Sequence, residues 1–241
     1  PGRPGWHLEC SAMSMKYLGE NFDLHTGGVD NIFPHHENEI AQSEGATGRP
    51  FVRYWMHVAH LMVESGKMAK SKGNFFTLRD LLEKGHEPRA LRWLLLSTHY
   101  RTPLNFTRAG MEQATSEIQR LDDLGARHGR EPAGDGHNED FEASVAKACN
   151  EFGDSLADDL NISGALGAVF RTVREAHVAM DRGELPSGSR EVLQEALKRF
   201  DSVLAVLEKP EVEVDQEIEE LIDRRIAARA SPSRVKFNGV R

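Results

Sequence analysis

The arrangement of a strand, a glycine turn and a helix over residues 22–44 most constrains how this chain can fold. Residues 22–25 (Phe-Asp-Leu-His) alternate apolar and polar side chains, which predicts a short strand. Residues 26–28 (Thr-Gly-Gly) interrupt it, and a helical segment follows to about Glu44, where Gly45 supplies a stop. This order is half of a βαβ unit. The apolar residues 54–63 predict a second, largely buried strand, so the first part of the chain is expected to be α/β.

The expected helix begins in a stretch of potential metal ligands, Phe33-Pro34-His35-His36-Glu37-Asn38-Glu39. Pro34 suits the first turn of a helix. His35 and Glu39 stand four residues apart and share one helix face, so both could bind one divalent ion. Cys10 could add a thiolate, and a set of nitrogen, oxygen and sulfur ligands favours zinc. Zinc usually has four ligands, and the alternative is a polar helix start beside a buried cysteine.

A lysine-rich loop is the second stretch that could carry chemistry. Residues 64–74 contain three lysines and two glycines and follow the expected buried strand. Flexible lysines on such a loop can close on a polyphosphate and stabilise the charge that develops during phosphoryl or nucleotidyl transfer. A solvated surface loop is the alternative interpretation.

The remainder of the chain is expected to be helical. Residues 6–18 already predict a helix ended by Gly19, and everything beyond residue 76 follows helical patterns. Glycine-rich residues 128–138 predict a linker. The expected helices before the linker are 78–84, behind a Thr77 and Asp80 capping pair; 88–97, opened by Pro88 with Leu91, Leu94 and Leu95 on one face; and 108–124, capped by Thr107.

Beyond the linker the pattern predicts a helical bundle. Its helices are expected at about 139–156, 161–181, 189–207 and 215–229, with Cys149 as a small buried thiol in the first of them. Ile218, Leu221, Ile222 and Ile226 form the apolar stripe of the last helix. The tail, residues 230–241, has no periodicity and is expected to be loose.

Composition excludes several classes of protein. Of the 241 residues, 39% are hydrophobic and 28% are charged, which is typical of a globular chain and not of a disordered one. No apolar run approaches the ~18 residues that a membrane helix needs, and no basic-then-apolar leader indicates secretion. Two cysteines suit a reducing cytoplasm, and a net charge of −8 argues against broad nonspecific nucleic-acid binding. The chain begins at Pro1 in a glycine- and proline-rich loop, so we expect a piece of something longer.

Three sequence blocks in order carry a family resemblance. Lys67-Met68-Ala69-Lys70-Ser71 resembles the KMSKS signature of class I aminoacyl-tRNA synthetases, with Ala69 in place of the usual serine. Residues 5–13 and residues 27–43 resemble the cysteinyl-tRNA synthetase versions of adjacent blocks. The resemblance is strong from Pro1 to about Phe106 and looser through the bundle.

The resemblance implies a domain organisation. Residues 1–76 would be the second half of a class I synthetase Rossmann-like catalytic domain, and residues 77–127 a helical connection. After the linker at 128–138, residues 139–229 would form an all-α bundle on the tRNA and anticodon side. The HIGH motif of the N-terminal half is not in this sequence. We therefore expect a C-terminal portion that is inactive alone and that needs the missing N-terminal half of the same enzyme as its partner.

The resemblance also implies a zinc site that selects the amino acid. Cys10, His35 and Glu39 match three zinc ligands of the family, and the fourth would be a cysteine upstream of Pro1. Zinc binds the thiolate of free cysteine, whereas serine offers only a hard hydroxyl. Such a site discriminates without an editing domain. Trp6 resembles a tryptophan that walls the amino-acid pocket, and packing in a core is its alternative.

ATP contacts follow from the same resemblance. Lys70, the second lysine of the signature, would contact the nucleotide, and Lys67 would help to clamp the phosphates with Mg²⁺. Gly27, Gly28 and Asp30 resemble the block that approaches the adenosine, where glycines allow close backbone approach and an aspartate suits ribose hydroxyls. Ala69 removes one hydroxyl contact and leaves both signature lysines.

The activity implied is that of a cytoplasmic cysteine–tRNA ligase. L-Cysteine and ATP would give cysteinyl-adenylate, and a terminal hydroxyl of tRNA(Cys) would then take the cysteinyl group. One alternative is a cysteine:amino-sugar ligase of thiol biosynthesis, and another is a noncatalytic tRNA-binding remnant. The bundle favours tRNA. Arg224, Arg225 and Arg229 are candidates for phosphate contacts, with a solvated helix face as the alternative.

Overall fold

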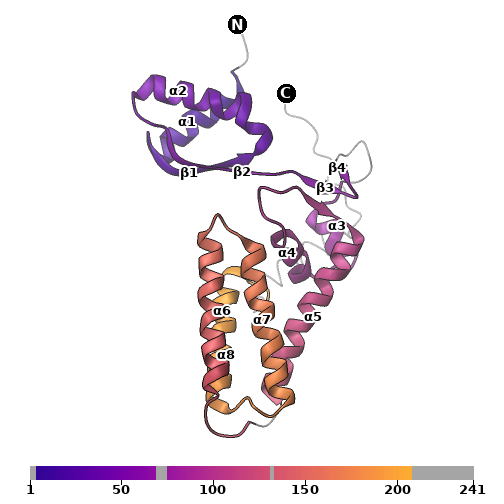
Figure 1. Ribbon diagram of the computed structural model, residues 1–241. Helices are drawn as coiled ribbons and strands as arrows, with labels where there is room; N and C mark the ends of the chain where they lie inside the picture. The colour runs from indigo at the N-terminus through magenta and orange to yellow at the C-terminus, as the bar shows by residue number, and fades with distance from the viewer. Residues whose placement is uncertain (1–3, 69–74, 131–132, 208–241) are drawn as a thin grey trace, which may run out of the picture. The chain divides into compact units, whose positions relative to one another are not determined.

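The computed structural model describes residues 4–68, 75–130 and 133–207. The first part is a parallel βαβ unit that is preceded in the sequence by a helix (Figure 1). Helix α1 (Trp6–Leu18) precedes strand β1 (Phe22–Gly28), helix α2 (Glu37–Thr47) and strand β2 (Val52–Val58). Strands β1 and β2 pair in parallel, with Phe22 opposite Val52 and Gly28 opposite Val58. The predicted α/β start is therefore confirmed, and α1 ends at the expected Gly19, whose φ is 96°.

Helix α2 begins and ends later than predicted. A 3₁₀ turn (Val29–Asn31) and one irregular turn (Ile32–His36) separate it from β1, so Pro34 and His35 precede the helix. Phe33 is extended, with φ −130° and ψ 131°, because a residue before proline is driven out of the helical region. Gly45 lies inside the helix. Gly48 ends it instead in the left-handed conformation, with φ 69°.

The second predicted strand is two strands in two sheets. Strand β2 ends at Val58, and β3 (Leu61–Val63) pairs antiparallel with β4 (Gly66–Lys67) and parallel with β5 (Leu104–Phe106). The break falls at residues 59–60, whose backbone groups form hydrogen bonds with residues 100 and 104. The prediction that this stretch is largely buried was also wrong, since Tyr54 is 65% exposed. Strand β5 corrects the expectation that everything beyond residue 76 is helical, because three residues are too few to show a period.

Helices α3 (Leu78–Glu83), α4 (Pro88–Leu96) and α5 (Arg108–Arg130) follow the predicted starts. Thr77 and Asp80 form the expected capping box, and Thr107 caps α5 by accepting a hydrogen bond from the Gly110 amide at 3.0 Å. Leu95 was predicted to share one face with Leu91 and Leu94, but it is 53% exposed whereas those two are buried.

Helix α5 continues six residues beyond the predicted end, into the expected linker. Contacts with the start of α8 (Ser187–Leu204) hold its last turns. His128 Nε2 lies 3.2 Å from the Arg190 carbonyl oxygen, and Arg190 donates to the His128 carbonyl at 3.1 Å. Such tertiary contacts outweigh the cost of the glycines inside the helix.

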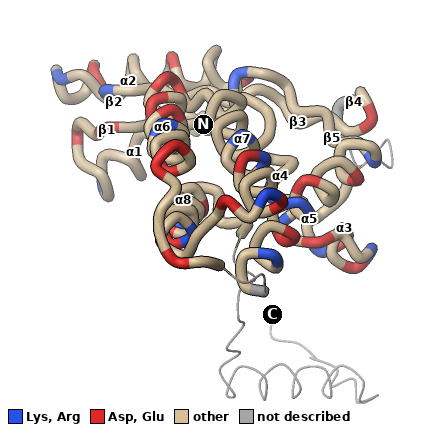
Figure 2. The backbone as a smooth tube through the Cα atoms, turned by 60° about the horizontal axis from the view of Figure 1, so that its bottom comes forward, with Lys and Arg blue, Asp and Glu red and all other residues tan. Residues whose placement is uncertain are grey.

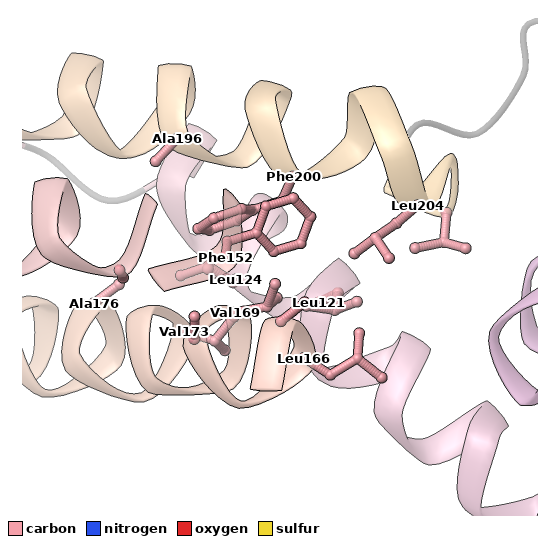
Figure 3. Packing of buried hydrophobic residues seen from close by; sticks show 14 of the residues in the cluster. Leu121, Leu124, Phe152, Leu166, Val169, Val173, Ala176, Ala196, Phe200 and Leu204 are labelled. Carbon is pink, nitrogen blue, oxygen red and sulfur yellow. The ribbon is translucent and has the colours of Figure 1, made fainter. Parts of the chain in front are cut away.

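The hydrophobic core belongs to the helical part. Helices α6 (Glu139–Ala157), α7 (Ile162–Asp181) and α8 form the predicted bundle, and the fourth expected helix and the tail lie outside the described residues. Phe152 and Phe200 pack with ring centroids 4.9 Å apart, and Leu121 and Leu124 from α5 join the same cluster (Figure 3). Cys149 is buried there as predicted, and burial raises the pKa of its thiol.

Charges of both signs are interspersed along the helices. Helix α5 carries both basic and acidic residues (Figure 2), and Arg108 pairs with Glu112 one turn later at 3.0 Å. None of the described helices is both long and apolar enough to cross a membrane.

Candidate metal and substrate site

Glu39 is the centre of a buried polar cluster between α1, α2 and β1. Its side chain is fully buried, and its Oε2 atom lies 2.7 Å from His25 Nε2, a hydrogen bond when that nitrogen carries the proton. Its Oε1 atom lies 2.8 Å from His35 Nε2, yet no hydrogen bond of correct geometry reaches Oε1 from any described residue. Two ligand atoms that face each other without a hydrogen bond fit a cation held by both.

Cys10 completes a set of three potential ligands. The Cys10 Sγ atom and one ligand atom each from His35 and Glu39 all lie within 4.8 Å of one another. Burial raises the pKa of the Cys10 thiol, and the neighbouring charges of Glu39 and Glu9 raise it further. A thiolate beside a buried carboxylate needs a cation to offset the charge. Sulfur, nitrogen and oxygen donors at this separation fit zinc, so the three residues predicted as ligands come together in the fold.

Trp6 lies against this cluster. Its ring stacks on the His35 ring, with centroids 3.9 Å apart and planes at 28°. The Trp6 side chain is 60% exposed, so one face covers the cluster and the other faces solvent. Trp6 therefore lies beside the three potential ligands and not in a hydrophobic core, and its role in an amino-acid pocket stays a prediction.

Three histidines and a tryptophan next to the buried Glu39 form a group that the sequence analysis did not predict. His36 Nδ1 lies 2.8 Å from His57 Nε2, and the His25 ring stacks on Trp55 with centroids 4.6 Å apart. Burial lowers the pKa of His36 to about 4, helped by the neighbouring His25, His57 and His35, so the ring is neutral at pH 7. The signal was present in the sequence, because Trp55 and His57 stand two apart on β2 and share one face.

Gly27, at the end of β1, has a packing reason to be glycine, and the predicted approach to adenosine stays a prediction. A Cβ atom on Gly27 would lie 2.5 Å from Cε1 of His36, so only glycine lets that ring pack against the strand. Asp30, the residue predicted to suit ribose hydroxyls, is exposed in the 3₁₀ turn after Gly28. Gly27 thus lies next to His36, and Gly28 lies next to Asp30.

The lysine loop is described only at its start. Lys67 is the last residue of β4, where its backbone pairs with Met62. The Lys67 side chain and Lys70 lie outside the described part of the structure, as do Arg224, Arg225 and Arg229. The roles predicted for them stay predictions.

Two family models match the chain. The model described as "tRNA synthetases class I (C) catalytic domain" matches residues 1–116, and the DALR domain matches residues 151–208. The first match contains the buried cluster and the lysine loop. The second begins within α6 and includes α7 and α8.

Relatives extend this similarity over most of the chain. The cysteine--tRNA ligase of Solibacter usitatus is 49% identical over 96% of this chain and 49% of its own length. The protein of the same name from Protochlamydia amoebophila is 48% identical over 95% of this chain and 48% of its length. That of Brachyspira hyodysenteriae is 43% identical over the whole chain and 52% of its length. The chain spans about half the length of the curated relatives it matches.

A solved structure shares the fold. The agnB2 LeuRS of Agrobacterium radiobacter K84, in a ternary complex with tRNA and LeuAMS, matches with a TM-score of 0.59. The match covers 76% of this chain and 26% of that one at 16% identity, so it shows the fold alone.

Proposed function

We propose that this chain, which belongs to the class I aminoacyl-tRNA synthetases, supplies the amino-acid-selecting metal site and the lysine loop of a cysteine–tRNA ligase. The observation that carries the proposal is the convergence of Cys10, His35 and Glu39, whose ligand atoms lie within 4.8 Å of one another. A protein of the relatives' full length would activate L-cysteine with ATP and transfer it to tRNA(Cys) in the cytoplasm. Both cysteines of the chain are free thiols, which suits that compartment.

The chain's own residues prepare the amino-acid site. Zinc, when bound by Cys10, His35 and Glu39, would supply a Lewis acid that accepts the thiolate of cysteine and rejects serine and methyl side chains. The hydrogen bond from His25 holds Oε2 of Glu39 and leaves Oε1 facing His35. Trp6 stacks on His35 and closes one side of the site.

The activation step needs charge stabilisation and positioning. The carboxylate of cysteine attacks the α-phosphate of ATP, a new oxygen–phosphorus bond forms, and pyrophosphate leaves. Lys67 and Lys70 would stabilise the charge that develops on the phosphates, together with Mg²⁺. Gly27, Gly28 and Asp30 would approach the adenosine. These ATP contacts rest on the match of the lysine loop and the glycine block to the family.

The acceptor is tRNA in this proposal. A terminal hydroxyl of the tRNA attacks the carbonyl carbon of the adenylate and releases AMP. The bundle α6–α8 and the DALR match at residues 151–208 favour tRNA over an amino-sugar acceptor. Charging assays that offer each acceptor in turn separate the two, and transfer to an amino-sugar alone would reject the tRNA reaction.

A matched pair of substitutions tests the metal site in a protein of the relatives' full length that carries this chain. Glu39→Gln removes one buried ligand charge, and Glu37→Gln makes the same change at an exposed position two residues earlier. We expect Glu39→Gln to lower both bound zinc and cysteine-dependent ATP–pyrophosphate exchange at least about 100-fold. Glu37→Gln should change neither. Normal zinc content and exchange in Glu39→Gln and in His35→Asn would reject the proposal.

A further inference from the structure

The corner between α6 and α7 has an unusual backbone. Asp159 and Leu160 are consecutive non-glycine residues in the left-handed region, with φ of 52° and 56°. Aspartate tolerates this conformation better than most residues, but leucine does not, and such a residue costs about 1 kcal/mol or more. A conformation of this kind persists only where the surrounding structure fixes it.

Three consecutive side chains from the segment before β5 converge on this corner. Arg101 Nε donates to Oδ2 of Asp159 at 2.6 Å, and Arg101 Nη2 donates to Oδ1 at 3.3 Å. The Tyr100 hydroxyl also donates to Oδ1, and His99 Nε2 lies 2.8 Å from the Asp159 carbonyl oxygen. We call His99, Tyr100, Arg101 and Asp159 the corner clasp. His99, Tyr100 and Arg101 therefore all contact one residue, Asp159.

The corner clasp continues into the junction between β2 and β3. The Tyr100 carbonyl accepts a hydrogen bond from the Ala59 amide at 2.7 Å, and the His60 carbonyl accepts one from Leu104 at 3.2 Å. The junction connects a strand next to the first candidate site with the strand that leads to the second. Strand β2 carries His57, which contacts the cluster behind Glu39, and β3 leads through β4 to the lysine loop.

The clasp contributes orientation more than stability. Its Arg101 and Asp159 side chains are 65% and 48% exposed, and exposed ion pairs are strongly screened. The apolar core already joins α4 and α5 to the bundle. Apolar residues of both parts, among them Met56, Leu156 and Ile162, also line one cavity between the junction and the bundle. Apolar contacts are less directional than hydrogen bonds, so the clasp is the group of described contacts best suited to fix the orientation of the junction.

We propose that Asp159 is a positioning residue that fixes the β2–β3 junction against the helical bundle, so that tRNA held by the bundle meets the cysteine and ATP sites in register. This inference rests on the proposed function and adds a residue outside both candidate sites. Loss of the clasp should therefore slow the transfer to tRNA, which needs the bundle. Activation of cysteine with ATP, which does not need the bundle, should be unchanged.

Two variants of Asp159 separate the side chain from the backbone. Asp159→Gly removes the carboxylate that Tyr100 and Arg101 bind, leaves the carbonyl that faces His99, and keeps a residue that favours the left-handed conformation. Asp159→Asn also tolerates that conformation and can still accept from Tyr100, but it loses the charged pair with Arg101. Glu195→Gln is the matched control, because it removes an exposed pair with Lys198 inside α8.

In the full-length protein we expect Asp159→Gly to lower kcat/KM for tRNA about tenfold, within the range found for coupling between distant sites. Asp159→Asn should lose less, and Glu195→Gln nothing. Cysteine-dependent ATP–pyrophosphate exchange should stay within twofold of the unaltered enzyme in all three. Equal losses in charging and exchange, or a normal Asp159→Gly variant, would overturn the proposal.

Amide hydrogen exchange supplies a readout that does not depend on the reaction. Asp159→Gly should speed exchange at the Ala59 and Leu104 amides, and Glu195→Gln should not. Unchanged exchange at both amides would show that Asp159 does not hold the junction. An unaltered enzyme without cysteine-dependent pyrophosphate exchange would reject the proposed function instead, and the amides would still decide whether the clasp exists in solution.

Discussion

The first part of the chain and the helical part bury opposite kinds of side chain. Among the described residues up to 68, the buried hydrophobic residues are Phe51 and Val63, and the buried polar ones are Ser11, His35, His36, Glu39 and Ser43. The apolar core draws its buried members from residues 90–206. A polar interior is stable when its groups bind each other or a ligand. The comparison therefore separates a region specified by chemistry from a region specified by packing.

The largest expected effect tests the packing region. Phe200 is fully buried against Phe152, so Phe200→Ala leaves a cavity and should cost about 4 kcal/mol of unfolding free energy. Urea unfolding followed by far-ultraviolet circular dichroism measures it. Val203→Ala, at a 46% exposed position on the same helix, is the control and should cost far less. Equal losses from the two variants would contradict a core organised around Phe200.

A second prediction asks whether the packing region also depends on one buried charge. Arg89 is 8% exposed and donates to Asp122 at 2.8 Å with both Nη atoms. Arg89 Nη1 also donates to the Val206 carbonyl at 3.1 Å. Arg89→Ala removes these hydrogen bonds from a buried position and should cost about 2 kcal/mol, discounted because Asp122 is partly exposed. The same urea experiment with Arg120→Ala, an exposed arginine on α5, should show almost no change.

A third prediction tests the polar region through an outer contact of the metal site. His25→Ala removes the hydrogen bond to Oε2 of Glu39, so the carboxylate is no longer held toward His35. We expect zinc affinity to fall about tenfold, measured by competition with a chelator in the full-length protein. The exposed His60 gives the control, His60→Ala, which should bind zinc normally. If His25→Ala retained full affinity, Glu39 would be oriented by other contacts.

The smallest effect lies at the start of α3, between the two regions. Backbone and side-chain hydrogen bonds from Thr77 lower the pKa of the Asp80 carboxyl. A lowered folded-state pKa stabilises α3 above the ordinary carboxyl pKa, and that stabilisation is lost as pH falls through the lowered value. An NMR titration of the Asp80 carboxyl should show a midpoint below the ordinary one. Thr77→Ala keeps the backbone amide, which is the larger cause, and removes the hydroxyl, so the midpoint should rise only part of the way to the ordinary value.

Sequence patterns predicted features that depend on local signals and missed features that depend on distant contacts. Helix starts such as Thr77 and Pro88 were found because capping and proline signals are local. The end of α5 was not, because contacts with Arg190 continue the helix past Gly125 and Gly129. The break between β2 and β3 was missed for the same kind of reason, since the residues that take its hydrogen bonds lie some forty positions later in the chain.

The candidate site was predictable only as far as its motif. Spacing favoured His35 and Glu39 as a pair, residue type and the family resemblance added Cys10, and the three side chains do lie close together. These signals could not place His25 or His57, because their proximity to Glu39 and His36 depends on the parallel register of β1 and β2. Pro34 misled the helix start, since the extended residue before it moves the first helical turn to Glu37. Local rules fail where distant segments or special backbone conformations decide the outcome.

The two thiols lie in different environments, so their reactivity can report whether the candidate metal site is occupied. Cys149 is closed inside the bundle, whereas Cys10 is half-buried among the three potential ligands. A chromogenic thiol reagent added to the folded protein should therefore modify one cysteine per chain, and after denaturation two. Bound zinc should protect that one reactive thiol. Simple colorimetry on unmodified protein would then count occupied sites, without a label or a substitution.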